Sequence, residues 1–191
     1  GLFIVATILV LIGSYSYLER EGMHHAEYYS LLLFACLGMM LFASALDLIV
    51  LFVALEIMSI AIYVLVGFRR TDTKSNEAAL KYFILGSAAS AVLLYGVALV
   101  YGATGSMNIQ VIGEYLKTHT EPNSLLSVGA VLVIVGFLFK VATVPFHMWM
   151  PDVYEGAPTT ITNFMTTGLK ASAFAAFVRV FISLGARPEA V

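Results

Sequence analysis

Charge is scarce in this chain, and hydrophobic residues take its place. Only 12% of the 191 residues are charged, whereas 60% are hydrophobic. A soluble domain carries about 25% charged residues and could not hide so much apolar surface. A soluble fold is therefore excluded, and a polytopic protein of the lipid bilayer is predicted. The net charge of −2 is too small to indicate a nucleic-acid partner.

Cysteine is nearly absent as well. Cys36 stands alone, which excludes an internal disulfide and a cysteine-based metal cluster. The chain also lacks the GxGxxG dinucleotide fingerprint, the P-loop, and the cysteine patterns of iron–sulfur and haem proteins. We therefore expect neither a metal ion nor a redox cofactor in this chain.

Long apolar stretches fill most of the sequence. A membrane-spanning helix needs roughly 20 apolar residues, and about six such stretches are present. We therefore expect an all-α transmembrane bundle. Its predicted helices are Leu2–Leu18, Tyr28–Leu46, Asp47–Phe68, Ala78–Gly102, Leu125–Met150 and Thr159–Leu184. The segments between them, including Ala103–Ser124 and Pro151–Pro158, are expected to be connections. Because the chain opens at Gly1 inside an apolar stretch, both ends are expected to be truncations.

Positive residues in the connections predict the orientation. The loops are expected to carry Arg20, Arg69, Arg70 and Lys74 on one side of the membrane, and Lys117 and Arg187 on the other. The side with more lysine and arginine is predicted to be cytoplasmic. Arg179 is expected toward the opposite side, which weakens the asymmetry.

Three titratable residues lie near the centres of predicted helices. They are Glu56, Lys140 and Lys170, and at 1.5 Å per residue all three are placed near the bilayer midplane. An ionised side chain there costs on the order of 3 kcal/mol on insertion scales, so such residues usually serve ion or proton traffic. The alternative is a snorkelling or structurally paired charge. From mid-membrane, however, water is on the order of 15 Å away, more than twice the reach of a lysine stem.

A contact between Glu56 and Lys140 would form a proton switch. Burial favours the neutral form of a lysine, whereas a nearby carboxylate favours the charged form. Movement of the carboxylate would therefore load or unload the lysine. The spacing of the residues leaves open whether these two side chains touch.

Pro145 predicts a break close to Lys140. Proline has no N–H to donate, and its ring crowds the preceding turn, so backbone carbonyls become free to bind water. His147 follows Lys140 by seven residues, which on a continuous helix is two turns along the same face. It is a candidate proton relay. A histidine that caps the second half-helix is an equal alternative.

Two further sets of polar residues are candidates. Thr159, Asn163, Thr166 or Thr167, and Lys170 recur at three- and four-residue spacing and would form one polar stripe. The stripe fits either a file of water molecules or hydrogen bonds between packed helices. Lys81 follows Glu77 by four residues and is either part of the proton path or an interfacial anchor paired with that carboxylate.

Four segments resemble the antiporter-like, proton-pumping subunits of NADH-quinone oxidoreductase, or respiratory complex I. They read ALEIMSIAIYVLVGF around Glu56, ALKYFILGS around Lys81, GFLFKVATVPFHMWMPDVYEGAP from Gly136 to Pro158, and ITNFMTTGLKASAF before and after Lys170. The resemblance covers almost the whole chain. Within this family, PDVYEGAP is similar to the subunit N branch rather than to its L and M paralogues.

This resemblance implies a fold of two inverted-topology five-helix repeats, each with a broken helix. Residues 28–185 would form the first repeat, residues 1–27 a preceding helix and loop, and the whole of 1–191 one transmembrane domain. In the family, the glutamate at Glu56 pairs with the lysine at Lys140, and the lysine at Lys170 links the half-channel to a central axis of charged residues. The lysine at Lys81 also belongs to the family pattern.

The resemblance also implies a function, partners and a location. The chain would translocate protons in the bacterial inner (plasma) membrane, driven by quinone reduction elsewhere in the complex. NADH, FMN, iron–sulfur clusters and quinone would bind in partner subunits, and the membrane partners would be subunit M and the small subunits K, J and A. The alternatives are a subunit of a cation/proton antiporter or of a related membrane-bound hydrogenase, and a structural scaffold whose charges fix helix register.

Overall fold

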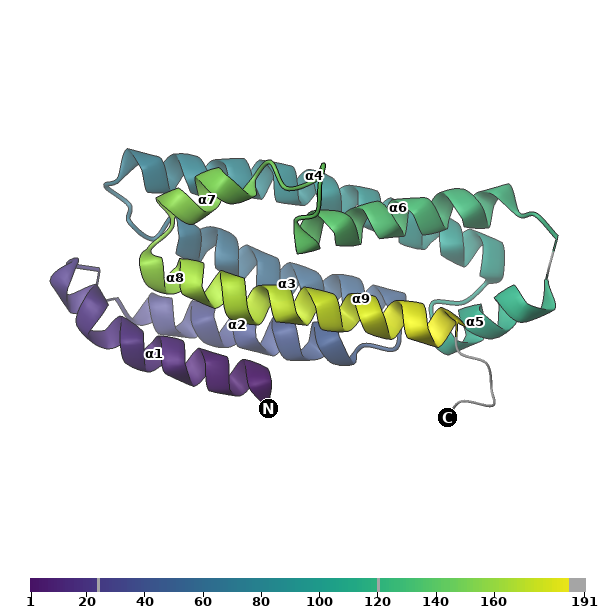
Figure 1. Ribbon diagram of the computed structural model, residues 1–191, viewed down its shortest axis with the longest axis horizontal. Coiled ribbons are helices and arrows are strands. Elements are labelled where there is room, and N and C mark those ends of the chain that lie inside the picture. Colours follow the sequence, from purple (N-terminus) through teal and green to yellow (C-terminus); the bar gives the residue numbers. More distant parts are fainter. Residues whose placement is uncertain (24, 120, 186–191) are drawn as a thin grey trace.

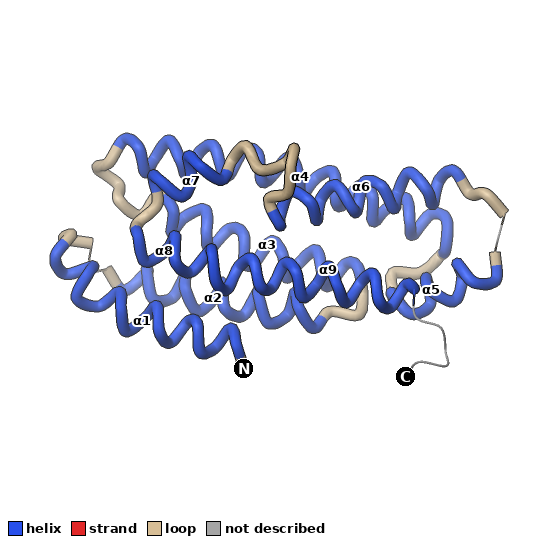
Figure 2. Tube along the Cα trace, viewed as in Figure 1, coloured by secondary structure: helices blue, strands red, loops and turns tan. Residues whose placement is uncertain are grey.

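The protein is a bundle of long helices. The computed structural model describes residues 1–23, 25–119 and 121–185, and within them every regular element is a helix (Figures 1 and 2). The elements are α1 (Leu2–Arg20), α2 (Ala26–Ser44), α3 (Leu48–Val66), α4 (Thr73–Thr104), α5 (Ile109–Thr118), α6 (Ser124–Val141), α7 (Met150–Gly156), α8 (Thr159–Phe164), the π-helical turn η1 (Met165–Leu169) and α9 (Lys170–Gly185). The last three elements follow one another without a break.

Six stretches of the described residues are long and apolar enough to cross a membrane. They are α1, α2, α3, α4, α6 and the continuous stretch Thr159–Leu184. Large apolar side chains such as Leu9, Phe34 and Val131 are more than half exposed on the outside of the bundle. A surface of this kind suits lipid rather than water. The predicted all-α, polytopic membrane fold is confirmed.

Side-chain caps fix where several helices begin. Asp47 accepts hydrogen bonds from the N–H groups of Ile49 and Val50, so α3 begins at Leu48, one residue after the predicted start. Asp72 accepts from the N–H of Lys74, so α4 begins at Thr73 and not at the predicted Ala78. The polar residues after Asp72 are therefore helical, because a capped amide at the N-terminus supports the first turn whatever the polarity of that turn.

One predicted connection contains a helix. The segment Ala103–Ser124 connects two spans, as expected, and α5 occupies ten of its residues. Asn108 caps α5, and Ile109 and Ile112 are buried on one face. The helix itself was not predicted, because α5 is too short to span a membrane and is amphipathic, so a search for long apolar runs misses it.

The helix that carries Lys140 is broken, as predicted, but at another residue. α6 ends at Val141, and Ala142 adopts the left-handed conformation (φ 61°) before the chain passes through a turn that contains the cis Val144–Pro145 bond. The expected helix to Met150 is therefore wrong. The expected connection Pro151–Pro158 is also wrong in part, because α7 begins at Met150 and accepts Pro151 in its first turn, where a missing N–H costs nothing.

Because of the break, α6 and α7 cover different halves of the length of α4. Figure 1 shows α6 ending about halfway along α4, with α7 beside the other half of α4. The ends of α1 and α3 and the start of α4 lie at one end of the bundle, and α5 lies at the other. Lys117 of α5 is thus separated, as predicted, from Arg20 at the end of α1, from Arg69 and Arg70 after α3, and from Lys74 at the start of α4. Arg187 lies outside the described residues. Which end faces the cytoplasm stays a prediction.

Candidate functional site

Lys140 is buried in the interior of the bundle. Its side chain is 6% exposed and lies one residue before the end of α6. The ammonium donates a hydrogen bond to the Ser59 hydroxyl at 2.8 Å, and the Tyr63 hydroxyl lies 3.5 Å away. Both partners belong to α3. Burial of a lysine against neutral hydroxyls is unusual, because a buried charge normally pairs with an opposite charge.

Glu56 lies on the same face of α3 but does not pair with Lys140. Glu56, Ser59 and Tyr63 follow one another at spacings of three and four residues, which brings them onto one face. The Glu56 carboxylate is close enough to Lys140 for electrostatic interaction, yet no ion pair joins the two in the described part of the chain. Its Oε1 atom is buried and has no hydrogen-bond partner among the described residues. Glu56 and Lys140 are therefore near each other, but their charged groups do not form the proposed ion pair.

His147 does not continue the face of Lys140. Because α6 ends at Val141, His147 lies in the turn before α7, and the predicted two-turn helical spacing is wrong. Its Nδ1 atom is buried and finds no hydrogen-bond partner in the part of the chain that the structure describes. A polar atom in this state normally binds water, so a relay role for His147 stays a prediction.

Lys170 turns toward the broken helix. Its ammonium lies 3.3 Å from the Met150 sulfur and 5.7 Å from the centre of the Tyr154 ring, both on α7. Within the described residues, Lys170 makes no ion pair, and it forms no hydrogen bond with Glu56 or Lys140. The Lys170 ammonium is thus held by a thioether sulfur and an aromatic ring, and not by a carboxylate of the described residues.

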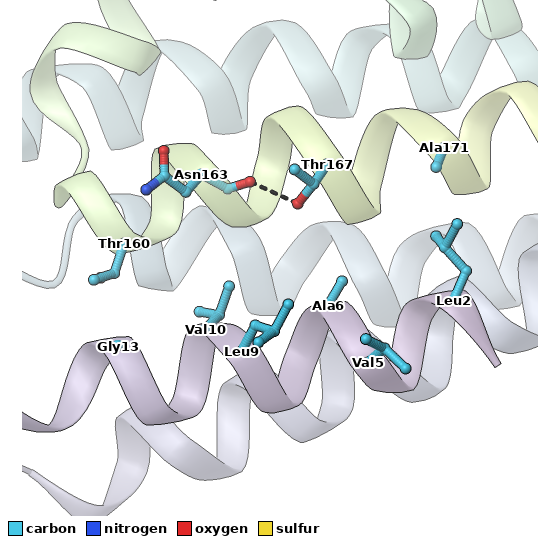
Figure 3. A pocket seen from close by; sticks show the side chains of 10 residues that line it. All are labelled: Leu2, Val5, Ala6, Leu9, Val10, Gly13, Thr160, Asn163, Thr167 and Ala171. Atoms are coloured by element: carbon cyan, nitrogen blue, oxygen red, sulfur yellow. Dashed lines mark hydrogen bonds between the residues drawn. The ribbon is translucent and has the colours of Figure 1, made fainter.

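The predicted polar stripe divides at the π-helical turn. Two of its residues, Asn163 and Thr167, line an apolar groove of about 680 Å³ together with Thr160, which was not part of the predicted stripe, and with residues of α1 (Figure 3). Lys170 instead contacts α7. A π-helical turn adds a residue to one turn and changes the face that the following residues occupy. The regular three- and four-residue spacing therefore does not produce one continuous face.

Lys81 joins α4 to α7. It forms ion pairs with Glu77 at 2.7 Å, as the spacing predicted, and with Asp152 at 2.8 Å. A second pair, Lys74 with Glu155 at 3.0 Å, connects the same two helices. All of these side chains are well exposed around a hollow of about 250 Å³. Sequence reasoning missed Asp152 and Glu155 because it treated their segment as a loop.

Ser59 and Tyr63 were also missed, although a signal was present. They are the polar positions three and seven residues after Glu56 in an otherwise apolar helix. Polar side chains at this spacing indicate a shared face. The spacing does not indicate, however, that Lys140 contacts Ser59 and Tyr63 on this face rather than Glu56.

In the part of the chain that the structure describes, no group of three or more His, Cys, Asp and Glu side chains could hold a metal ion.

Comparison with known proteins gives the family. The sequence profile of the transmembrane family described as NADH:quinone oxidoreductase/Mrp antiporter matches residues 45–190. The chain belongs to this family.

Relatives and solved structures agree with this assignment. NADH-quinone oxidoreductase subunit N 1 of Chloroherpeton thalassium is 51% identical over 95% of this chain, and the match spans 38% of that protein. Respiratory complex I from Thermus thermophilus with bound aureothin gives a TM-score of 0.74 at 42% identity, covering 100% of this chain and 41% of the matched chain. The membrane-bound sulfane sulfur reductase, an archaeal respiratory membrane complex, gives 0.78 at 30% identity, covering 95% and 37%.

These comparisons confirm the resemblance to antiporter-like subunits of complex I and to the subunit N branch. The chain spans only about 38% of the length of the curated relative described above.

Proposed function

We propose that this chain is part of a proton-translocating membrane subunit of NADH:quinone oxidoreductase. In this proposal Glu56, Lys140 and Lys170 exchange protons inside the membrane. Quinone reduction elsewhere in the complex drives the exchange through neighbouring subunits.

One observation carries the proposal. Lys140 is buried at the end of a broken membrane helix, with hydroxyl partners and without a paired carboxylate in the described part of the chain. A charge that merely fixes helix register would be expected to pair, because an unpaired buried ion costs several kcal/mol, on the order of 3 or more in protein mutants. A lysine that must lose its proton at one stage of a cycle gains from a site without a permanent counter-charge.

The other candidates have supporting roles in this scheme. Glu56 supplies the carboxylate that favours the loaded lysine. Lys170, beside α7, would take the proton onward, and His147 would relay it through the turn between α6 and α7. Lys81 is secondary, because its contacts with Glu77 and Asp152 are those of an anchor.

The proposal includes the surroundings of the chain. Residues 28–185 would be one five-helix repeat within a single transmembrane domain, in the bacterial inner membrane. The partners would be subunits M, K, J and A, and NADH, FMN, iron–sulfur clusters and quinone would bind elsewhere in the complex. The antiporter and hydrogenase alternatives use the same residues. The higher identity to the Thermus thermophilus complex than to the sulfane sulfur reductase favours complex I.

Proton pumping by the parent complex in membrane vesicles tests the proposal. We expect Lys140→Ala to lower pumping and coupled NADH oxidation at least about tenfold, a loss typical of a removed proton-transfer group, while assembly stays normal. Lys117→Ala on the short helix α5 is the control and should pump normally. Pumping at the unmodified rate by Lys140→Ala would support the scaffold alternative instead.

A further inference from the structure

The polar face of α3 offers the ammonium of Lys140 more than one position. Glu56, Ser59 and Tyr63 lie on this face in a row, and the ammonium now occupies its hydroxyl end. Consecutive residues of an α-helix are separated by 1.5 Å along the axis, so Glu56 lies roughly 4.5 Å from Ser59 in this direction. A lysine stem with four rotatable bonds covers such a distance without any movement of the helices.

Hydrogen bonding at the two ends of the row is incomplete. An ammonium has three N–H donors, and the two hydroxyls are the partners that Lys140 has in the described residues. The Ser59 hydroxyl donates its own proton to the Leu55 carbonyl, which leaves its lone pairs for Lys140. At the other end, the buried Oε1 of Glu56 accepts no hydrogen bond from any described residue. Each end therefore holds a group that the other could satisfy.

Aromatic packing holds the Tyr63 hydroxyl in place. The Tyr63 ring meets Tyr82 of α4 edge-on, at 4.8 Å between ring centres. Tyr82 stacks on Trp149, which directly precedes α7 and donates a hydrogen bond to the carbonyl of Phe139. The hydroxyl position is thus connected through rings to both sides of the helix break.

The helix α4 leaves space for this hydroxyl. A Cβ atom built at Gly86 would overlap the Tyr63 hydroxyl group. Glycine at position 86 is therefore required for the observed placement of the Tyr63 ring. The group that needs the space is the Tyr63 hydroxyl, not the backbone of α3.

We propose that the Ser59 and Tyr63 hydroxyls form a second, uncharged seat for the Lys140 ammonium, an alternative to its pairing with Glu56. We call this pair of hydroxyls the hydroxyl seat. The inference rests on the proposed function and deepens it. Ser59 and Tyr63 are positioning residues, since they hold the lysine without taking its proton.

The two positions differ in how they hold the proton. Beside Glu56 the carboxylate would pair directly with the ammonium, whereas at the hydroxyl seat hydroxyl dipoles hold it and the carboxylate acts only from a distance. At the seat an N–H bond of Lys140 breaks, its electron pair stays on Nζ, and the proton passes to a water molecule. The neutral amine regains a proton from water when it returns to Glu56. The seat therefore separates loading from release.

Removal of the hydroxyls tests the seat. In the parent complex, Ser59→Ala combined with Tyr63→Phe should leave the lysine paired with Glu56 and hence loaded. We expect the number of protons pumped per NADH oxidised to fall about tenfold, the effect of losing hydrogen bonds to a charged group. The pH optimum of pumping should move to higher pH, because release from a carboxylate-paired ammonium needs a lower proton concentration.

Two controls separate position from packing. Ser59→Thr keeps a hydroxyl and should retain the unmodified ratio and pH optimum. Ser90→Ala removes a buried hydroxyl of α4 that has no hydrogen-bond partner within residues 1–23, 25–119 and 121–185, and it should change neither quantity. If the double variant does not assemble, Tyr63→Phe alone, which removes one oxygen atom, decides the question by the same pH profile.

Lys140→Ala in the same series separates the two claims. Loss of pumping in Lys140→Ala together with an unchanged ratio and pH optimum in the hydroxyl variants would overturn the seat and leave the proposed function standing. Unimpaired pumping by Lys140→Ala would overturn the proposed function and the seat with it.

Discussion

At Gly38 the backbones of α2 and α3 approach so closely that no side chain fits between them. A Cβ atom at this position would lie 2.6 Å from the Met58 backbone nitrogen. Small residues at such contacts let membrane helices pack by van der Waals contact, which matters where lipid offers no hydrophobic driving force. Gly13 of α1 is the opposite case, because its added Cβ would meet nothing within 4 Å.

These two glycines make a matched pair for a stability test. Gly38→Ala should destabilise the bundle by about 1–3 kcal/mol through overpacking against backbone that cannot retreat. Gly13→Ala should be neutral or stabilising by about 0.4–1 kcal/mol, since alanine favours the helix and loses less entropy on folding. Thermal denaturation of the detergent-solubilised protein measures both. Equal effects of the two variants would contradict the packing described here.

The short helix α7 depends on its contact with α4 more than on its own length. Seven residues are too few for an independent helix. Besides its two ion pairs with α4, its Gly156 leaves no room for a Cβ, which would lie 2.5 Å from the Ala78 Cβ. Close contact at Gly156 therefore fixes the position of α7, and the ion pairs add orientation.

The Lys81–Asp152 pair should contribute only modestly to stability. Its side chains are 46% and 52% exposed, and exposed pairs are worth about 0.2–1 kcal/mol. A double-mutant cycle of Lys81→Met and Asp152→Asn, followed by thermal denaturation, should give a coupling energy in this range that decreases at high salt. A coupling energy of several kcal/mol that does not depend on salt would show that the pair is desolvated, contrary to the structure.

At the same scale, the elements divide into those that the sequence could predict and those that it could not. The spans α1, α2 and α3 were predicted within a few residues, because lipid contact demands a long apolar run. The end of α6 was predicted at the wrong residue. The residue in the left-handed conformation that ends this helix is Ala142 and not glycine, the residue that usually indicates such an end in a sequence. The helix α7 was missed, because its charges are satisfied by α4 and not by neighbours in sequence.

The candidate site shows the same limit. Depth arithmetic placed Lys140 and Glu56 at one level of the membrane, but the sequence left open whether their side chains approach each other. The hydroxyl partners of Lys140 depend on the relative position of α3 and α6 along their axes. This offset is set by side-chain packing, which the periodicity of one sequence does not reveal.

For the whole molecule, the charge distribution and the broken helix together define a topology. The start of α4 and the helix α7 lie at one end of the bundle, where Lys74 pairs with Glu155. The short helix α5, with Lys117, lies at the other end. The excess of positive loop residues predicts that the first end faces the cytoplasm.

Cysteine labelling tests this topology. Cys36 is the single cysteine of the sequence and is buried. Because it is the single one, Cys36→Ala gives a chain without a thiol as the background. In this background, Arg70→Cys and Glu155→Cys should react with a membrane-impermeant thiol reagent from the same side, and Lys117→Cys only from the opposite side. Reaction of Glu155→Cys from the side of Lys117→Cys would mean that α7 does not return to the end of the bundle where α4 begins.

The central claim is that Lys140 carries protons rather than a fixed charge, and Lys140→Arg in the parent complex tests it most directly. Arginine keeps the positive charge and the hydrogen-bond donors but does not release a proton in proteins. Proton pumping and coupled NADH oxidation should therefore fall as far as in Lys140→Ala. Rates equal to those of the unmodified complex would show that the charge alone suffices and would contradict the account.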